Sequence, residues 1–135
     1  MALAIGKLRG MTPDLKAKLK ARGLETTDDL FEAALTPQGR QELAAYAGVP
    51  EQTILELANR ADLARIKGIA GVYSDLLEEA GVDTVKELRG RVPENLHAKL
   101  LEINAQKTLT AQPPAPKTVK NWVSLARRRR KFLQY

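Results

Sequence analysis

The sequence of 135 residues contains no cysteine and a single histidine, His97. Without cysteine the chain can form no disulfide, no thiolate metal site and no cysteine nucleophile. One histidine also excludes a metal site built from several histidines and makes a histidine-based catalytic triad a poor expectation. His97 lies beside Leu96 and Leu100 in NLHAKLL, which favours a surface or boundary position over a chemical role.

Long apolar runs are also missing. No run approaches the length of about 20 residues that a membrane-spanning helix needs, and the N-terminal MALAIGKLRG lacks the continuous apolar stretch of a signal peptide. The lack of cysteine agrees with a reducing compartment. We therefore expect a soluble, cytoplasmic protein of one compact domain that does not contact membranes.

Motifs of catalysis and nucleotide binding are absent as well. The chain has no Gly-x-x-x-x-Gly-Lys-[Ser/Thr] phosphate loop, and GIAG is too short for a dinucleotide fingerprint. Carboxylates such as Asp28, Asp29, Glu78 and Glu79 fall at predicted helix ends or on polar faces, where the helix dipole and solvation account for them. We expect a protein that is not an enzyme, with no cofactor and no small-molecule substrate.

What the chain does contain is an internal repeat. Residues 8–30 read LRGMTPDLKAKLKARGLETTDDL, and residues 66–88 read IKGIAGVYSDLLEEAGVDTVKEL. Each copy closes into a segment that begins Val-Pro-Glu, and the first copy alone carries the insertion LTPQGRQELAAYAG. The alignment pairs Gly10 with Gly68, Leu19 with Leu77, Gly23 with Gly81, Thr26 with Thr84 and Leu30 with Leu88.

The apolar spacing within each copy is helical. Leu15 and Leu19 lie four residues apart and share a helix face, and the second copy repeats this spacing at Tyr73 and Leu77. In both copies a glycine follows, the residue that most readily adopts the left-handed conformation just past a helix end. Each copy is therefore predicted to contain a short helix that ends at this glycine.

Further helix starts are marked by capping residues and prolines. Thr27 is predicted to cap the next helix, with Asp28 and Asp29 favoured by the helix dipole, and Thr84 and Glu87 are spaced as a capping box. No segment alternates as a strand does, so the predicted class is all-α, with two units packed face to face around one shared core. Other starts are expected at Thr36-Pro37, Val49-Pro50-Glu51 and Val92-Pro93-Glu94.

The composition changes after the second copy. TAQPPAPKT is predicted to be extended, because clustered prolines cannot continue a helix. Val119, Trp122, Val123 and Ala126 then form one apolar stripe, with Trp122 as its core anchor. Successive helical positions lie about 100° apart, so the arginine run would push one arginine into the core, and the helix should end near Arg127. The predicted organisation is a tandem domain at 1–109 (repeats at about 5–62 and 63–109), a Pro-rich linker at 110–117, and a C-terminal docking helix with a basic tail at 118–135.

The net charge of +6 belongs to this tail. Residues 1–111 hold 15 basic and 16 acidic side chains, whereas residues 112–135 hold 7 basic and no acidic ones. The two copies also differ in charge: residues 7–22 carry six basic side chains against Asp14, and residues 65–80 carry two against three acids. A basic first copy and a basic tail are therefore the candidates for contact with an anionic partner.

The order of short helix, glycine turn, second helix, AG-x-x-[ST] and third helix resembles the helix-hairpin-helix module. More closely, the chain resembles a bacterial family of tandem helix-hairpin-helix proteins catalogued as a domain of unknown function. GVDTVKEL, NRADLARIKGI and ENLHAKLLEIN carry this likeness, which covers about residues 5–125. The resemblance implies an all-α tandem fold and assigns no activity.

Helix-hairpin-helix DNA binders present backbone N–H groups to phosphate at a turn that reads glycine, apolar residue, glycine. Here the triplets are Gly-Met-Thr and Gly-Ile-Ala, and both lack the second glycine. Asp75, Glu78 and Glu79 would repel a phosphate at the second turn, which leaves the first. The predicted nucleic-acid-binding residues are Gly10, Thr12, Lys16, Lys18 and Lys20, together with Arg127, Arg128, Arg129, Arg130 and Lys131 of the tail.

Simpler interpretations stand beside this prediction. The turns can serve packing alone, the lysines can form a solvated helix face, and the tail can act only in solubility. The two functional hypotheses are a non-catalytic module that contacts the nucleic-acid backbone without sequence specificity, and a protein-interaction or scaffold module that binds an acidic partner through its basic tail. The acidic stretch from Glu25 to Asp62 would suit a basic partner under the second hypothesis.

Overall fold

Helices form where apolar residues at helical spacing follow a capping residue or a proline. The computed structural model describes residues 3–69 and 71–135, and over these residues it contains no strand, only an isolated antiparallel bridge between Ala4 and Thr26. The all-α prediction is confirmed. Within the described chain, no helix has the length and apolarity needed to cross a membrane. The elements are a short 3-10 helix, η1 (Ile5–Lys7), followed by α1 (Pro13–Ala21), α2 (Thr27–Ala33), α3 (Pro37–Ala47), α4 (Glu51–Leu63), α5 (Val72–Glu79), α6 (Val85–Arg89), α7 (Pro93–Lys107) and α8 (Pro116–Arg127).

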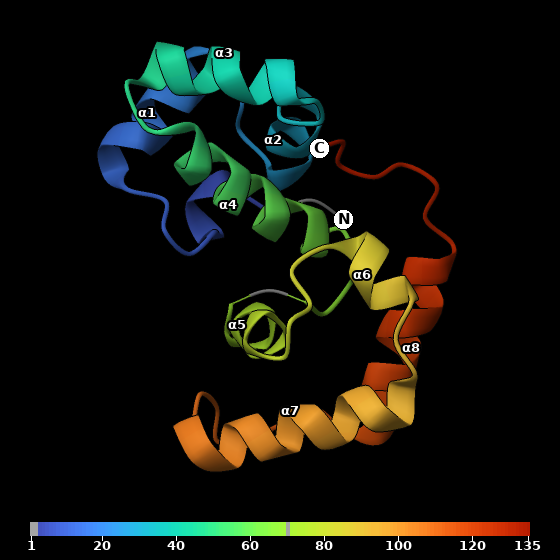
Figure 1. The fold of residues 1–135 in the computed structure, drawn as a ribbon. Coiled ribbons are helices and arrows are strands. Elements are labelled where there is room, and N and C mark those ends of the chain that lie inside the picture. Colours follow the sequence, from blue (N-terminus) through green and yellow to red (C-terminus); the bar gives the residue numbers. More distant parts are fainter. Residues whose placement is uncertain (1–2, 70) are drawn as a thin grey trace.

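The buried apolar side chains divide into two clusters where the sequence predicted one shared core. The first cluster is built from η1 to α4, and the second from the end of α4 to α8. Figure 1 shows α1–α4 gathered at one end of the molecule and α5, α7 and α8 at the other. The first unit closes its own core because the insertion forms α3, which packs on α1 and α4. The second unit lacks this helix, and α8 packs on α6 and α7 instead.

The two copies of the repeat have the same local geometry. Gly10 has a φ of +91° and Gly68 a φ of +94°, a conformation that side chains with a Cβ rarely adopt. The turn that contains this glycine is closed in one copy by the bond from Met11 N–H to Leu8 O (3.2 Å) and in the other by Ile69 N–H to Ile66 O (3.0 Å). The alignment of the two copies in sequence is therefore a structural equivalence as well.

The cap of α2 lies one residue earlier than predicted. Thr26 caps the helix by accepting a hydrogen bond from the N–H of Asp29 (3.1 Å), and the Asp29 carboxylate accepts from the N–H of Thr26 (3.0 Å). Bonds from backbone N–H groups to this carboxylate lower the pKa of Asp29. The prediction of Thr27 was wrong because Thr27 is buried and its hydroxyl accepts from the N–H of Leu3 (3.2 Å). Thr84 caps α6 as predicted, by accepting from the N–H of Glu87 (3.2 Å), but the predicted capping box is incomplete, because the Glu87 carboxylate accepts from the Thr84 hydroxyl (3.3 Å) and not from its backbone N–H.

The apolar stripe of α8 is confirmed. Val119, Trp122, Val123 and Ala126 are all buried in the second core, and α8 ends at Arg127. The tail then turns back toward the first unit, which the sequence did not predict. We call residues 128–135 the strap; it runs without helix from α8 to the region of α2 (Figure 1), and its Leu133 is buried in the first core.

Candidate nucleic-acid interface

The first glycine turn is exposed but partly satisfied from within the chain. Gly10 and Thr12 are both exposed. The Thr12 hydroxyl accepts from the N–H of Leu15 (3.2 Å), and Pro13, the first residue of α1, has no N–H to offer. A phosphate at the start of α1 would be bound by free backbone N–H groups. Here the N–H of Leu15 is already bonded and Pro13 has none.

Two arginines beside this turn point to the second unit. Arg9 forms an ion pair with Asp75 of α5 (2.5 Å). Arg60 of α4 donates to both carboxylate oxygens of Glu78 (3.1 and 3.2 Å) and also to the carbonyl of Arg9. Asp75 and Glu78 of the second copy are thus paired with bases of the first unit, while Glu79 pairs with Lys107 of α7 (2.7 Å). Part of the difference in charge between the copies is therefore complementarity between the two units.

The three lysines of α1 do not form one patch. Positions 16 and 20 lie on one side of a helix and position 18 on the other. Lys18 donates to the carbonyl of Ala47 (2.9 Å) and lies 3.2 Å from Asp14. Lys16 is half-buried against Gly6, and Lys20 is exposed. The predicted basic surface at the first turn therefore does not form, because Lys18 lies on the opposite side of α1 from Lys16 and Lys20.

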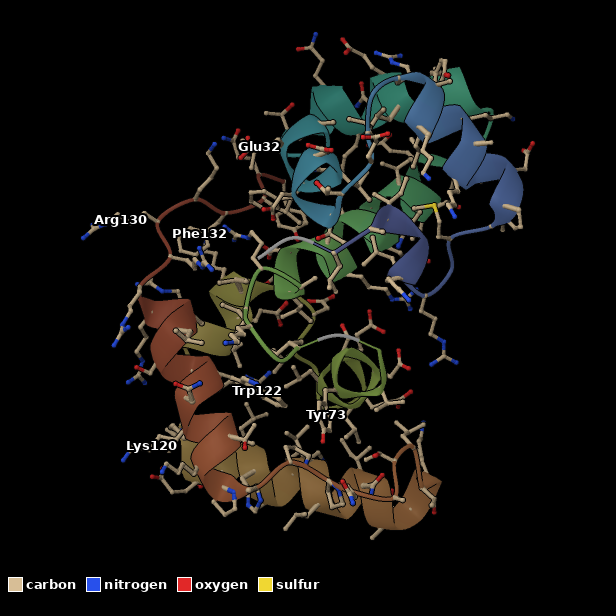
Figure 2. All side chains as sticks on the ribbon, turned by 180° about the vertical axis from the view of Figure 1, so that it is seen from behind. Glu32, Tyr73, Lys120, Trp122, Arg130 and Phe132 are labelled. Carbon is tan, nitrogen blue, oxygen red and sulfur yellow. The ribbon has the colours of Figure 1, made fainter. Side chains whose placement is uncertain are left out.

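The second glycine turn packs against Trp122, although Gly68 itself is exposed. A Cβ at Gly68 would lie 3.2 Å from the indole nitrogen of Trp122, which is 1% exposed. The Tyr73 ring packs against the same indole at a centroid distance of 5.5 Å, and Figure 2 shows both rings between α8 and α5. This turn serves packing in the folded chain.

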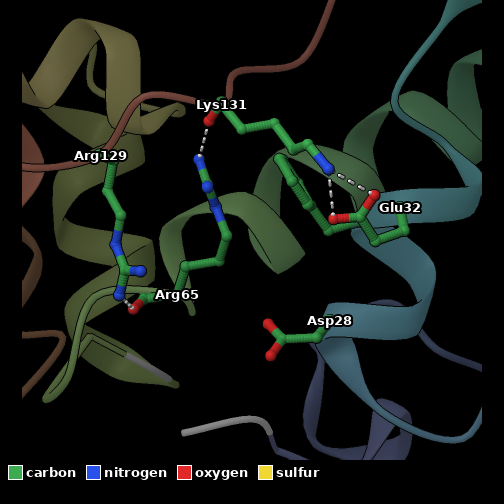
Figure 3. Close-up of a pocket in the computed structure, with 6 residues that line it drawn as sticks. Asp28, Glu32, Arg65, Arg129 and Lys131 are labelled. Carbon is green, nitrogen blue, oxygen red and sulfur yellow. Dashed lines mark hydrogen bonds and ion pairs between the residues drawn. The ribbon is translucent and has the colours of Figure 1, made fainter.

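The cations of the tail alternate between the body and solvent. Arg127 donates to the carbonyl of Arg89 (3.3 Å), Arg129 to the carbonyl of Arg65 (2.7 Å), and Lys131 to both oxygens of Glu32 (3.0 Å each). The contacts of Arg129 and Lys131 border a pocket of about 240 Å³ between α2 and the strap (Figure 3). Arg128 and Arg130 are exposed, and over the described residues neither side chain makes a hydrogen bond or ion pair. Figure 2 shows Arg130 pointing away from the body.

Sequence reasoning missed a basic face on α8. Lys117 and Arg128 fall on the side of the helix opposite its buried stripe, Lys120 and Arg127 lie on the flank of the helix, and all four are exposed. They span about 16 Å along the axis at 1.5 Å per residue. With Arg130 they form what we call the basic face: Lys117, Lys120, Arg127, Arg128 and Arg130. A helical projection of residues 116–128 would have revealed it, because the same projection gives the apolar stripe.

The basic face continues into a groove between the starts of α7 and α8. The groove has a volume of about 490 Å³ and is lined by both lysines of the basic face and by Glu94 and His97. His97 is partly buried, and its Nε2 lies 3.1 Å from the carbonyl of Pro114. The boundary position predicted for His97 is confirmed.

The predicted site residues lie on two separate surfaces. Figures 1 and 2 place α1 on one side of the molecule and the strap with α8 on the other. Lys16, Lys18 and Lys20 belong to α1, and Gly10 and Thr12 come just before it in the chain. The structure therefore does not bring the first turn and the arginine run together. Of the predicted residues, Arg128 and Arg130 belong to the basic face without a contact to the body, Arg127 lies on this face but donates to the carbonyl of Arg89, and Arg129 and Lys131 face the body.

Acidic side chains gather on a third surface. A groove of about 430 Å³ is lined by four acids of α4, α5, α6 and the adjoining turn, together with Arg60 and three uncharged residues; the acids are Glu56, Glu78, Asp83 and Glu87. Here a hydrogen bond with Asp83 and burial raise the pKa of Glu87 to about 7. Burial likewise raises the pKa of Asp62, against the N–H of Val85 (2.8 Å) and the charge of Arg65. Among the residues that the structure describes, no three acidic or histidine side chains are placed to hold a metal ion.

Comparison with known proteins identifies a family. Residues 9–129 match the family described as Domain of unknown function (DUF4332), and the chain belongs to this family. No curated protein and no solved structure matches the chain. The function must therefore be argued from the surfaces described above.

Proposed function

We propose that this chain is a non-catalytic module that contacts the phosphate backbone of nucleic acid, without sequence specificity, through the basic face. The observation that carries the proposal is the run of exposed cations along α8 and into the strap, in a segment with no acidic residue from 112 to 135. A helix that presents several lysines and arginines along one side matches a row of phosphates.

We also propose that the two units are helix-hairpin-helix modules. The matching φ angles of Gly10 and Gly68 and the matching bonds around them support this interpretation. The hairpins then serve mainly as folding units here, because Trp122 packs against one turn and the guanidinium of Arg60 lies beside the other. The phosphate contact passes instead to α8, the helix that completes the second unit.

The absence of sequence specificity follows from the chemistry of the face. Lysine is a flexible point charge, and arginine on an exposed helix side reaches phosphates before base edges. Affinity should fall steeply with salt, because each neutralised phosphate releases a counterion. If all five cations of the basic face contact phosphate, the slope of log K against log salt should be about −4 to −5.

The test is a titration of generic duplex DNA against the full-length chain at low and physiological salt, read by fluorescence anisotropy. Lys120→Glu with Arg128→Glu should reduce affinity at least tenfold and flatten the salt slope. The matched control is Lys16→Glu with Lys20→Glu on α1, which makes the same charge change on the opposite side and should leave affinity nearly unchanged.

Two results would overturn the proposal. If the α1 variant loses affinity and the α8 variant does not, the contact lies at the first turn. If the unmodified chain fails to bind at low salt, the nucleic-acid function is wrong, and the alternative, an interaction module for an acidic protein, becomes the working hypothesis.

A further inference from the structure

The strap is held by the first unit as a peptide is held by a receptor. Leu133 is 5% exposed and belongs to the first core. The next residue is fixed by its backbone: the N–H of Gln134 donates to the carbonyl of Leu35 (2.8 Å), and its carbonyl accepts from Arg40 (2.6 Å). Proteins that bind extended peptides commonly hydrogen-bond both the N–H and the carbonyl of a residue and bury a neighbouring apolar side chain in a pocket.

Arg40 is built into this site. It is 3% exposed, and its Nη1 donates to the carbonyls of Ala34 (2.9 Å) and Leu35 (3.3 Å) just after α2. The guanidinium is thereby fixed in place, and its Nη2 is presented to the strap. An arginine held in this way on one side and free on the other is a preorganised donor for a peptide carbonyl.

The side chains of the strap contact the two units alternately. Lys131 pairs with Glu32, Leu133 enters the first core, and the hydroxyl of Tyr135 donates to Asn59 (2.9 Å). These three positions are two residues apart, which is the spacing of side chains on one side of an extended chain. Phe132, on the other side, packs against the second core, and Figure 2 shows it directed inward from the strap.

We propose that this surface of the first unit is a peptide-recognition site that the strap occupies in cis, and that it accepts in trans an extended peptide with a basic residue, leucine and an aromatic residue at alternate positions. The inference is independent of nucleic-acid binding. Residues 128–130 join the bound segment to α8 without helical structure, so the strap is a tethered ligand. A short tether gives an effective concentration in the millimolar range, against which a free peptide must compete.

The experiment uses the full-length chain with Leu133→Asp, which releases the strap because a carboxylate is not tolerated in the first core. The probe is a fluorescein-labelled peptide with the sequence of residues 130–135, RKFLQY. We expect the peptide to bind this variant at least ten times more tightly than it binds the unmodified chain. The same peptide with aspartate in place of leucine should not bind.

A charge swap tests whether the peptide occupies the proposed site. Glu32 is 55% exposed, so Glu32→Lys in the Leu133→Asp background should not disturb folding. This change should lower the affinity for the peptide severalfold, and a peptide with glutamate at the position of Lys131 should bind the Glu32→Lys variant with the original affinity. Binding that is indifferent to both changes would place the peptide elsewhere and overturn the proposal.

A second measurement needs no variant. In the unmodified chain the N–H of Gln134 is bonded to Leu35, so its hydrogen exchange reports release of the strap. Addition of unlabelled peptide at about 1 mM, the range of the competing tether, should accelerate this exchange severalfold. If the exchange rate does not change and the Leu133→Asp chain does not bind or does not fold, the proposal is wrong.

Discussion

Arg60 of α4 and Glu78 of α5 form a bidentate ion pair between the units, with Nε and Nη2 of the guanidinium 3.1 and 3.2 Å from the two carboxylate oxygens. The pair unites residues from two copies of one repeat that have acquired opposite charge. Together with the pair of Arg9 and Asp75, it gives two acids of the second copy basic partners in the first unit.

Replacement of Arg60 by methionine should lower the free energy of unfolding by about 1–3 kcal/mol, since the change removes bonds to a charged group that is largely covered. The Arg60 and Glu78 side chains are 20% and 27% exposed. Urea unfolding followed by circular dichroism measures the loss. The control is Lys99→Met on α7, whose pair with Glu102 spans 4.0 Å between exposed side chains, and which should cost less than about 0.5 kcal/mol. Equal losses in the two variants would contradict the link between the units.

Trp122→Ala should destabilise the chain by about 3–5 kcal/mol, the usual cost of removing a buried aromatic side chain. The indole lies against Tyr73 and above Gly68, so the variant leaves a cavity where α8 meets the second unit. Trp122→Phe fills most of this space and should cost less than half as much. A loss below about 1 kcal/mol for the alanine variant would mean that α8 is not needed for the second core.

Glu87 should make stability depend on pH. Its pKa is raised from 4.5 to about 7 in the folded chain, so the native state holds an extra proton between these values. The free energy of unfolding therefore falls as pH rises from about 4.5 to 7. Above pH 7 Glu87 is ionised in both states, and the native state bears the whole cost of its charge. Glu87→Gln keeps a hydrogen-bonding partner for Asp83 without the charge. It should stabilise the chain at pH 8, with little effect at pH 4.5, in urea unfolding at the two pH values. If Glu87→Gln stabilises the chain equally at pH 4.5 and pH 8, the raised pKa is not that of Glu87.

Leu133→Ala should cost about 2–3 kcal/mol, because the side chain is buried in the first core. Tyr135→Phe removes only the bond to Asn59 at a position 70% exposed and should cost less than about 1 kcal/mol. Thermal unfolding of the two variants against the unmodified chain gives the comparison. If Leu133→Ala is as mild as Tyr135→Phe, the strap is not part of the core.

Local features of the fold could be predicted from the sequence, and long-range ones could not. The glycine turns at Gly10 and Gly68 and the stripe around Trp122 depend on neighbouring residues, and a period or a repeat reveals them. Thr27 was mistaken for the cap because both threonines have capping chemistry, and only the burial of Thr27 under Leu3 decides between them. The strap could not be predicted for the same reason, whereas the basic face is local to α8 and the sequence contained the signal for it. Nothing local in ARRRRKFLQY shows that Leu133 enters a core formed by the opposite half of the chain.

The position of the strap in the sequence sets an order of events during synthesis. The helices that form its binding surface, α2 to α4, are complete at Leu63, and Leu133 is added only near the end of the chain. At about 5–20 residues per second the ribosome needs roughly 4 to 14 seconds for that interval. During that interval the first unit lacks Leu133, and under the peptide-recognition proposal a matching segment of another polypeptide can reach the site before the chain's own segment does.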